Sequence, residues 1–130
     1  MLPYLNDSNQ RIFYSFALIV YSGLIYLLSD RPGMITLDLF PHQDKLVHGI
    51  AYGVMAGLGR MAFLCWPQVK PVDLWAWFYA ALYGASDEWH QSFVPGREVD
   101  FLDWGADALG AALVLLVWRY WRSRAARINS

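Results

Sequence analysis

Residues 12–29 read IFYSFALIVYSGLIYLLS, a run of 18 residues without a single charge. Coiled at about 1.5 Å per residue, this run nearly spans a hydrocarbon core about 30 Å thick. It is longer than the roughly 7–15 apolar residues of a signal peptide, and no small-residue cleavage motif follows it. We therefore expect residues 12–29 to form a retained transmembrane helix that also targets the chain to the membrane.

Three more apolar segments follow along the chain. We expect helices at residues 44–66, 72–93 and 100–121. The chain is 57% hydrophobic and 16% charged, whereas about a quarter of an average soluble domain is charged. A soluble helical bundle is the alternative, but it requires polar helix faces that these segments lack. The sequence therefore predicts an all-α fold: one domain over residues 1–130, a bundle of four transmembrane helices.

Two of the expected helices carry small residues at four-residue spacing. The second helix has Gly49, Gly53 and Gly57. The fourth helix has Ala106 and Gly110. Small side chains one turn apart leave a smooth strip that another helix backbone can approach closely. We expect both strips to be packing faces.

Lysine and arginine are distributed unevenly between the two sides of the membrane. With four spans, both chain termini and the 67–71 connection share one side, and the 30–43 and 94–102 connections share the other. The first side holds seven of the ten basic residues and the second holds three. Because cytoplasmic loops are enriched in Lys and Arg, we expect both termini to be cytoplasmic.

Net charge and cysteine content exclude two other classes of protein. The formal net charge of −1 offers no basic surface, so we expect no nucleic-acid partner. Cys65 is the single cysteine and lies in an apolar run. The chain therefore has no intrachain disulfide and no cysteine-based metal site.

Polar residues gather at the extracytoplasmic ends of the second, third and fourth helices. Within each helix several of them are three or four residues apart and share a face. Ionisable groups at the margin of the hydrocarbon core are costly unless paired or hydrated, so we expect them to converge in a pocket. The set comprises Asp44, Lys45, His48, Asp87, Glu88, Gln91, Arg97, Asp100, Asp103 and Asp107.

Such a pocket is typical of acid–base chemistry. Neighbouring carboxylates raise the pKa of one member, and an adjacent cation lowers the pKa of another. We predict that the catalytic residues are His48, Glu88 and Asp103. We predict that the substrate-binding residues are Asp44, Lys45, Asp87, Gln91, Arg97 and Asp107.

Simpler roles remain open for several polar residues. Asp100 or Asp103 can be the N-cap of the fourth helix. Lys45 and Arg97 can be interface anchors whose charges reach toward water. For His90 a surface position outside the pocket is favoured.

Metal ligation is a further alternative. Asp44 with His48, and Asp103 with Asp107, place pairs of oxygen or nitrogen ligands one helical turn apart. The sequence DEWHQ at 87–91 nevertheless differs in order and spacing from a compact motif such as HExxH. We therefore predict no metal site and no cofactor.

Four short motifs, in this order, resemble the VanZ-like family of small bacterial membrane proteins: DKxxH at 44–48, DExxQ at 87–91, PGR at 95–97 and DxxxDxxG at 103–110. The resemblance extends over about residues 40–117 and implies a location in the bacterial inner membrane. The founding member of the family is associated with resistance to the glycopeptide teicoplanin, so the resemblance implies a link to glycopeptide resistance and to the cell envelope.

One position departs from the family pattern. Many family members carry Asn where this chain has Asp107. The additional negative charge makes Arg97 or Lys45 the expected partner of Asp107.

Two functions remain open at this point. In the first, an enzyme acts on a lipid-linked envelope substrate, with Glu88 or Asp103 as general acid or base and His48 as proton carrier. Lys45 and Arg97 would then hold an anionic headgroup. In the second, a non-catalytic module binds an envelope lipid, a glycopeptide or a partner protein.

Two other roles fit the sequence less well. A transport role is disfavoured because the centres of the first and third helices are uncharged, although an oligomer is compatible with the sequence. A purely structural interhelical network is a further alternative. Membrane lipids are the expected partners in every case.

Overall fold

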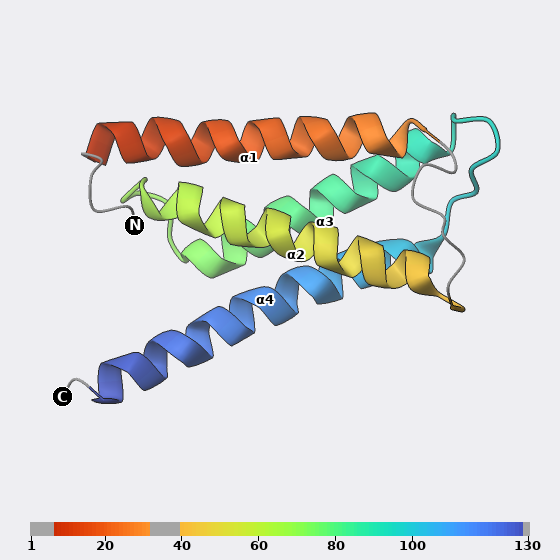
Figure 1. The fold of residues 1–130 in the computed structure, drawn as a ribbon. Coiled ribbons are helices and arrows are strands. Elements are labelled where there is room, and N and C mark those ends of the chain that lie inside the picture. The colour runs from red at the N-terminus through yellow and green to blue at the C-terminus, as the bar shows by residue number, and fades with distance from the viewer. Residues whose placement is uncertain (1–6, 32–39, 129–130) are drawn as a thin grey trace.

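The computed structural model describes residues 7–31 and 40–128. These residues form four helices and no strand, which confirms the all-α prediction. The helices run antiparallel to their chain neighbours (Figure 1). They are α1 (Asp7–Ser29), α2 (Gln43–Leu64), α3 (Val72–Gln91) and α4 (Phe101–Ile128).

The helix bounds depart from the predicted ones mainly at the two outer helices. α1 begins at Asp7, whose negative charge suits the positive end of the helix dipole. α4 continues to Ile128 through residues 122–128, a segment beyond the predicted helix end at residue 121. That segment is rich in Arg and Ala and has neither Gly nor Pro, so its intrinsic helix propensity is high.

Three helices among the described residues, α1, α2 and α4, are long and apolar enough to cross a membrane. α3 has 20 residues and carries Asp73, Asp87 and Glu88, which lower its hydropathy. The first turn of α1 and the last turn of α4 lie at the same end of the molecule (Figure 1). Beyond its middle, α4 leans away from the other helices.

The predicted small-residue strips of α2 and α4 do pack against each other. A Cβ atom built on Gly49 would lie 3.4 Å from the carbonyl oxygen of Ala106. One built on Gly53 would lie 3.2 Å from the carbonyl oxygen of Gly110, and one on Gly110 would overlap the carbonyl of Gly49. The two backbones are therefore in direct contact, which brings the polar ends of α2 and α4 together.

Side-chain to backbone hydrogen bonds attach α3 and α1 to this pair. The indole N–H of Trp104 donates to the carbonyl of Ala81 at 2.9 Å, which joins α4 to α3. The Tyr21 hydroxyl donates to the carbonyl of Ala51 at 2.9 Å, which joins α1 to α2. Each bond satisfies a polar group that would otherwise be costly in an apolar environment.

Charged residues also connect the helices at the end opposite the polar pocket. Arg60 of α2 is 6% exposed, and its Nε donates to Asp73 of α3 at 2.7 Å. Its guanidinium also lies 4.9 Å from the ring centroid of Trp118 in α4. This buried cation is therefore compensated by a carboxylate and an aromatic face.

Candidate functional site

The shallower of two charged groups at the polar end is centred on Lys45, and we call Asp44, Lys45, Asp100 and Asp103 the Lys45 network. The Lys45 ammonium donates to Asp103 at 2.7 Å, to Asp100 at 2.8 Å and to Asp44 at 3.1 Å. An ammonium has three protons, so all of its donors are used. The network is internally satisfied.

Asp100 has a second role in this network. Its Oδ1 accepts a hydrogen bond from the backbone N–H of Leu102 at 2.8 Å, so Asp100 caps the N-terminus of α4. The ammonium of Lys45 lowers the pKa of the Asp100 carboxyl below its ordinary value. The hydrogen bond from Leu102 confirms that Asp100 is the N-cap of α4.

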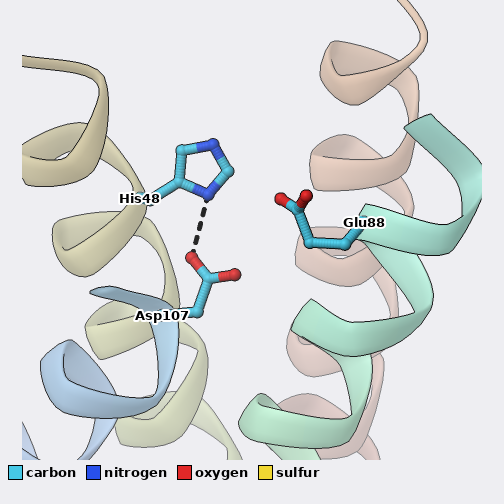
Figure 2. A group of neighbouring side chains, drawn as sticks. All are labelled: His48, Glu88 and Asp107. Carbon is cyan, nitrogen blue, oxygen red and sulfur yellow. Dashed lines mark hydrogen bonds and ion pairs between the residues drawn. The ribbon is translucent and has the colours of Figure 1, made fainter. Parts of the chain in front are cut away.

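The deeper group consists of His48, Glu88 and Asp107, which we call the His48 cluster (Figure 2). The three residues come from α2, α3 and α4 respectively. His48 Nδ1 lies 2.9 Å from Asp107 Oδ1, in hydrogen-bond contact. The Glu88 carboxylate faces this pair, and one ligand atom from each residue lies within 4.8 Å of the others.

Two carboxylate oxygens of the His48 cluster have no partner among the described residues. Asp107 is 0% exposed and Glu88 is 5% exposed. Asp107 Oδ2 and Glu88 Oε1 are both buried without a hydrogen bond, whereas Glu88 Oε2 accepts from the backbone N–H of Asp100 at 3.0 Å. Buried oxygens of this kind are costly, and an unpaired one calls for an explanation.

Gly84 makes room for the Asp107 carboxylate. A Cβ atom on Gly84 would lie 2.7 Å from Asp107 Oδ2, closer than any ordinary contact. Gly84 lies one turn before Glu88 on α3. The absence of a side chain at this position therefore allows Asp107 to reach the space in front of Glu88.

A third polar group links α1 to α3. The Gln91 side-chain amide donates to Ser29 Oγ at 2.8 Å and to Asp87 Oδ2 at 3.3 Å. The Tyr52 hydroxyl and Asp87 Oδ1 are buried without a hydrogen bond to the described residues, although they are near enough to interact electrostatically. Unsatisfied polar atoms thus continue from the His48 cluster toward α1.

A cavity of about 200 Å³ opens between α1, α2 and α3. α1 contributes mostly apolar side chains to its wall, whereas α2 and α3 contribute both apolar and polar residues. The cavity thus offers an apolar surface and a polar surface to the same ligand. Its lining includes Leu24, Ile25, Leu28, His48, Asp87 and Gln91.

Arg97 lies at this cavity and supplies its cation. Its Nε is buried and has no acceptor among the described residues. No carboxylate in the described part of the chain forms an ion pair with it. A guanidinium presents five donors in a planar fork, a geometry that suits a carboxylate or a phosphate.

The structure brings most of the predicted site residues together at one end of the bundle. His48, Glu88 and Asp107 meet directly, and Asp87, Gln91 and Arg97 line the neighbouring cavity. Lys45 and Asp103 pair with each other, and Asp103 Oδ2 is 3.9 Å from His48 Nε2. Asp44 is peripheral, because its side chain is 55% exposed.

One expected pairing is wrong. Asp107 was expected to pair with Arg97 or Lys45, but its partner is His48. Lys45 binds other carboxylates nearer the helix ends, and Arg97 faces the cavity. His90 lies outside the cluster, as expected, with Nε2 3.3 Å from Asp30.

Sequence reasoning missed Tyr52 and Gly84. Tyr52 follows His48 by four residues and Gly84 precedes Glu88 by four. Residues at this spacing lie one turn apart on the same helix face. Both residues would have been predicted if the polar faces of the second and third helices had been extended by one turn into the bundle.

Apolar helices long enough to span a bilayer, with ionisable groups gathered at one end, define a helical membrane protein. The chain belongs to the VanZ/LLP1 family, whose model matches residues 4–122. This finding confirms the resemblance seen in the sequence motifs. No curated protein and no solved structure matches the chain.

Proposed function

We propose that this protein binds a lipid-linked compound of the bacterial envelope, with its anionic headgroup at Arg97 and its chain along the apolar wall of α1. The observation that carries the proposal is Arg97, whose buried Nε has no acceptor among the described residues, at a cavity lined by apolar side chains of α1. A cation beside an apolar surface matches the two parts of an anionic lipid. Lys45 is a weaker candidate for the headgroup, because its donors are already occupied.

The proposal includes the topology of the chain. α3 enters as the fourth span, since its 20 residues extend about 30 Å. Both termini lie in the cytoplasm, and the polar end faces outward from the inner membrane. The excess of basic residues on the side of the termini supports this orientation.

We further propose that the protein is an enzyme that acts on the bound headgroup through the His48 cluster. His48 lies on the cavity wall, and its hydrogen bond to Asp107 fixes the orientation of the imidazole. Glu88 faces the same space, and Asp103 approaches the other ring nitrogen. A positioned imidazole between carboxylates is suited to move a proton to or from a substrate.

The cavity also bears on the proposed link to teicoplanin. Its volume of about 200 Å³ is below the roughly 300–1,000 Å³ of sites for drug-sized ligands. A direct glycopeptide site there is therefore disfavoured. Any effect of this protein on glycopeptide sensitivity would act through an envelope lipid.

Lipid retention tests the binding proposal. The protein is extracted in mild detergent, and co-purifying lipids are identified by mass spectrometry for the wild type and Arg97→Gln. We expect an anionic lipid in the wild type and at least a tenfold loss in the variant. Arg31→Gln is the matched control, because Arg31 is an exposed arginine at the same end. Equal retention in both variants would contradict the proposal.

Turnover of the retained lipid class separates the enzyme from a binding module. An enzyme should convert the lipid, and Glu88→Gln should abolish conversion while leaving lipid retention intact. A binding module should show retention without conversion in the wild type. That second result would reject the catalytic part of the proposal and keep the binding part.

Cysteine labelling tests the orientation. In a Cys65→Ser background, Glu98→Cys and Ser123→Cys are treated with a membrane-impermeant maleimide in intact cells. We expect Glu98→Cys to be labelled directly and Ser123→Cys only after permeabilisation. Both positions are exposed on the protein. The reverse pattern would invert the proposed topology, and labelling of both positions in intact cells would exclude it.

A further inference from the structure

We propose that His48, Glu88 and Asp107 form a binding site for a divalent transition-metal ion, such as Zn²⁺ or Mn²⁺. The inference goes beyond the proposed function, because an ion would bind whether or not a lipid enters the cavity. It also departs from our prediction from the sequence that the chain has no metal site. With an ion bound, His48 and Glu88 would act through the ion instead of as free proton carriers.

The geometry is close to that of a metal site. One ligand atom from each of the three residues lies within 4.8 Å of the others. Tetrahedral coordination with bonds of about 2.1 Å places ligand atoms about 3.4 Å apart. Small side-chain rotations therefore suffice to bring the three ligand atoms to this spacing. Because the three residues belong to three different helices, the fold itself holds them in place.

The unpaired oxygens point to a ligand that is bound between these side chains. Asp107 Oδ2 and Glu88 Oε1 are buried without a partner in the described part of the chain. Glu88 is directed toward His48 and Asp107 (Figure 2) and is buried. A cation would provide the missing partner for both oxygens at once.

The charge balance favours the same conclusion. Two carboxylates of the cluster are buried, and the nearest ammonium, that of Lys45, donates its three protons to other carboxylates. Protonated His48 would supply one positive charge. A divalent ion supplies two and would balance both carboxylates, which otherwise resist burial.

The donor set selects the type of ion. One imidazole nitrogen with carboxylate oxygens suits Zn²⁺ and Mn²⁺, whereas Mg²⁺ and Ca²⁺ prefer oxygen ligands alone. Three protein ligands also leave a coordination position open. His48 lines the cavity, so this position is accessible from the place where we locate the headgroup.

Ion binding to the purified protein tests the site. Protein without a polyhistidine tag is stripped with a chelator and titrated with Zn²⁺, and bound metal is measured by mass spectrometry. We expect about one equivalent for the wild type, at least tenfold weaker binding for His48→Gln and Asp107→Asn, and unchanged binding for His90→Gln. The proposal is overturned if the wild type binds no ion, if His90→Gln weakens binding equally, or if Mg²⁺ binds as tightly as Zn²⁺.

A second measurement needs no variant and therefore no assumption about folding. The chain has three histidines, and their imidazole nitrogens can be followed by NMR during the Zn²⁺ titration. We expect the signals of His48 to shift at one equivalent, and a shift confined to His42 or His90 would reject the site. Arg97→Gln should bind Zn²⁺ normally, so failure of the metal proposal is distinguishable from failure of lipid binding.

Discussion

The Lys45 network and the His48 cluster lie one helical turn apart and are built from similar residues, yet they differ in how well their charges are satisfied. Lys45 donates to three carboxylates within 3.1 Å. The His48 cluster retains two buried oxygens with no partner among the described residues. A group whose polar atoms are all hydrogen-bonded stabilises the fold, whereas a group with unpaired buried oxygens is suited to bind a ligand.

Depth in the bundle accounts for the difference. In the network, the side chains of Lys45 and Asp100 are 22% and 40% exposed. In the cluster, the side chains of His48 and Asp107 are 15% and 1% exposed. Water can compensate the charges that lie near the helix ends, but it does not reach Asp107. Substitutions in the two groups test this division between a structural and a functional group.

Lys45→Met should cause a large loss of stability. Removing the ammonium leaves Asp100 and Asp103 close together without their shared cation, which we expect to lower the free energy of unfolding by about 1–3 kcal/mol. Thermal unfolding in detergent, followed by tryptophan fluorescence, measures the change. Lys70→Met is the control, since Lys70 is exposed and lies away from the network. If both variants unfold alike, the network does not stabilise the fold.

Gly84→Ala should cause a loss of stability of similar size. The added Cβ would press on Asp107 Oδ2 at 2.7 Å, and overpacking of this kind costs about 1–3 kcal/mol. The carboxylate must shift, so Zn²⁺ affinity should fall as well. Gly105→Ala is a matched control, because a Cβ there meets nothing within 4 Å. Equal behaviour of the two variants would show that Gly84 is not needed to accommodate Asp107.

The helices and their packing faces could be predicted from the sequence because hydropathy and small-residue spacing are local properties. Gly49 and Gly110 illustrate this, since both were predicted to lie on packing faces, and both lie on the contact between α2 and α4. The predicted end of α4 at residue 121 is wrong, because hydropathy falls at the arginines that follow Trp121 but the helix does not end there. Helix propensity carries α4 on to Ile128.

The pairing of charges could not be read from spacing alone. It depends on the rotation and relative depth of α2, α3 and α4, which are tertiary properties. Lys45 meets Asp103, and His48, one turn deeper, meets Asp107. Both helices start at the same end, so matching residues by depth would have given this pairing. No spacing within the sequence of α3 indicates that Glu88 lies opposite His48 and Asp107.

Ser29→Ala should have a small effect. It removes the 2.8 Å hydrogen bond from Gln91 that links α1 to α3. Hydrogen bonds between helices in membranes contribute about 0.6 kcal/mol on average, so we expect a loss of that size in the free energy of unfolding. Ser92→Ala provides the comparison, because Ser92 bonds only within its own turn and is exposed. A loss above about 2 kcal/mol for Ser29→Ala would mean that α1 is held mainly through this bond.

Glu88→Gln should leave the stability of the protein unchanged or slightly higher, while lipid conversion and the stabilisation by Zn²⁺ are lost. The amide oxygen can still accept from the backbone N–H of Asp100, as Glu88 Oε2 does at 3.0 Å. The substitution removes a buried negative charge that no described residue compensates, so the protein without metal should unfold at the same or a higher temperature. Zn²⁺ should raise the unfolding temperature of the wild type and not that of the variant. If Glu88→Gln unfolds as easily as Lys45→Met, the charge of Glu88 stabilises the fold, and the division between the two groups is wrong.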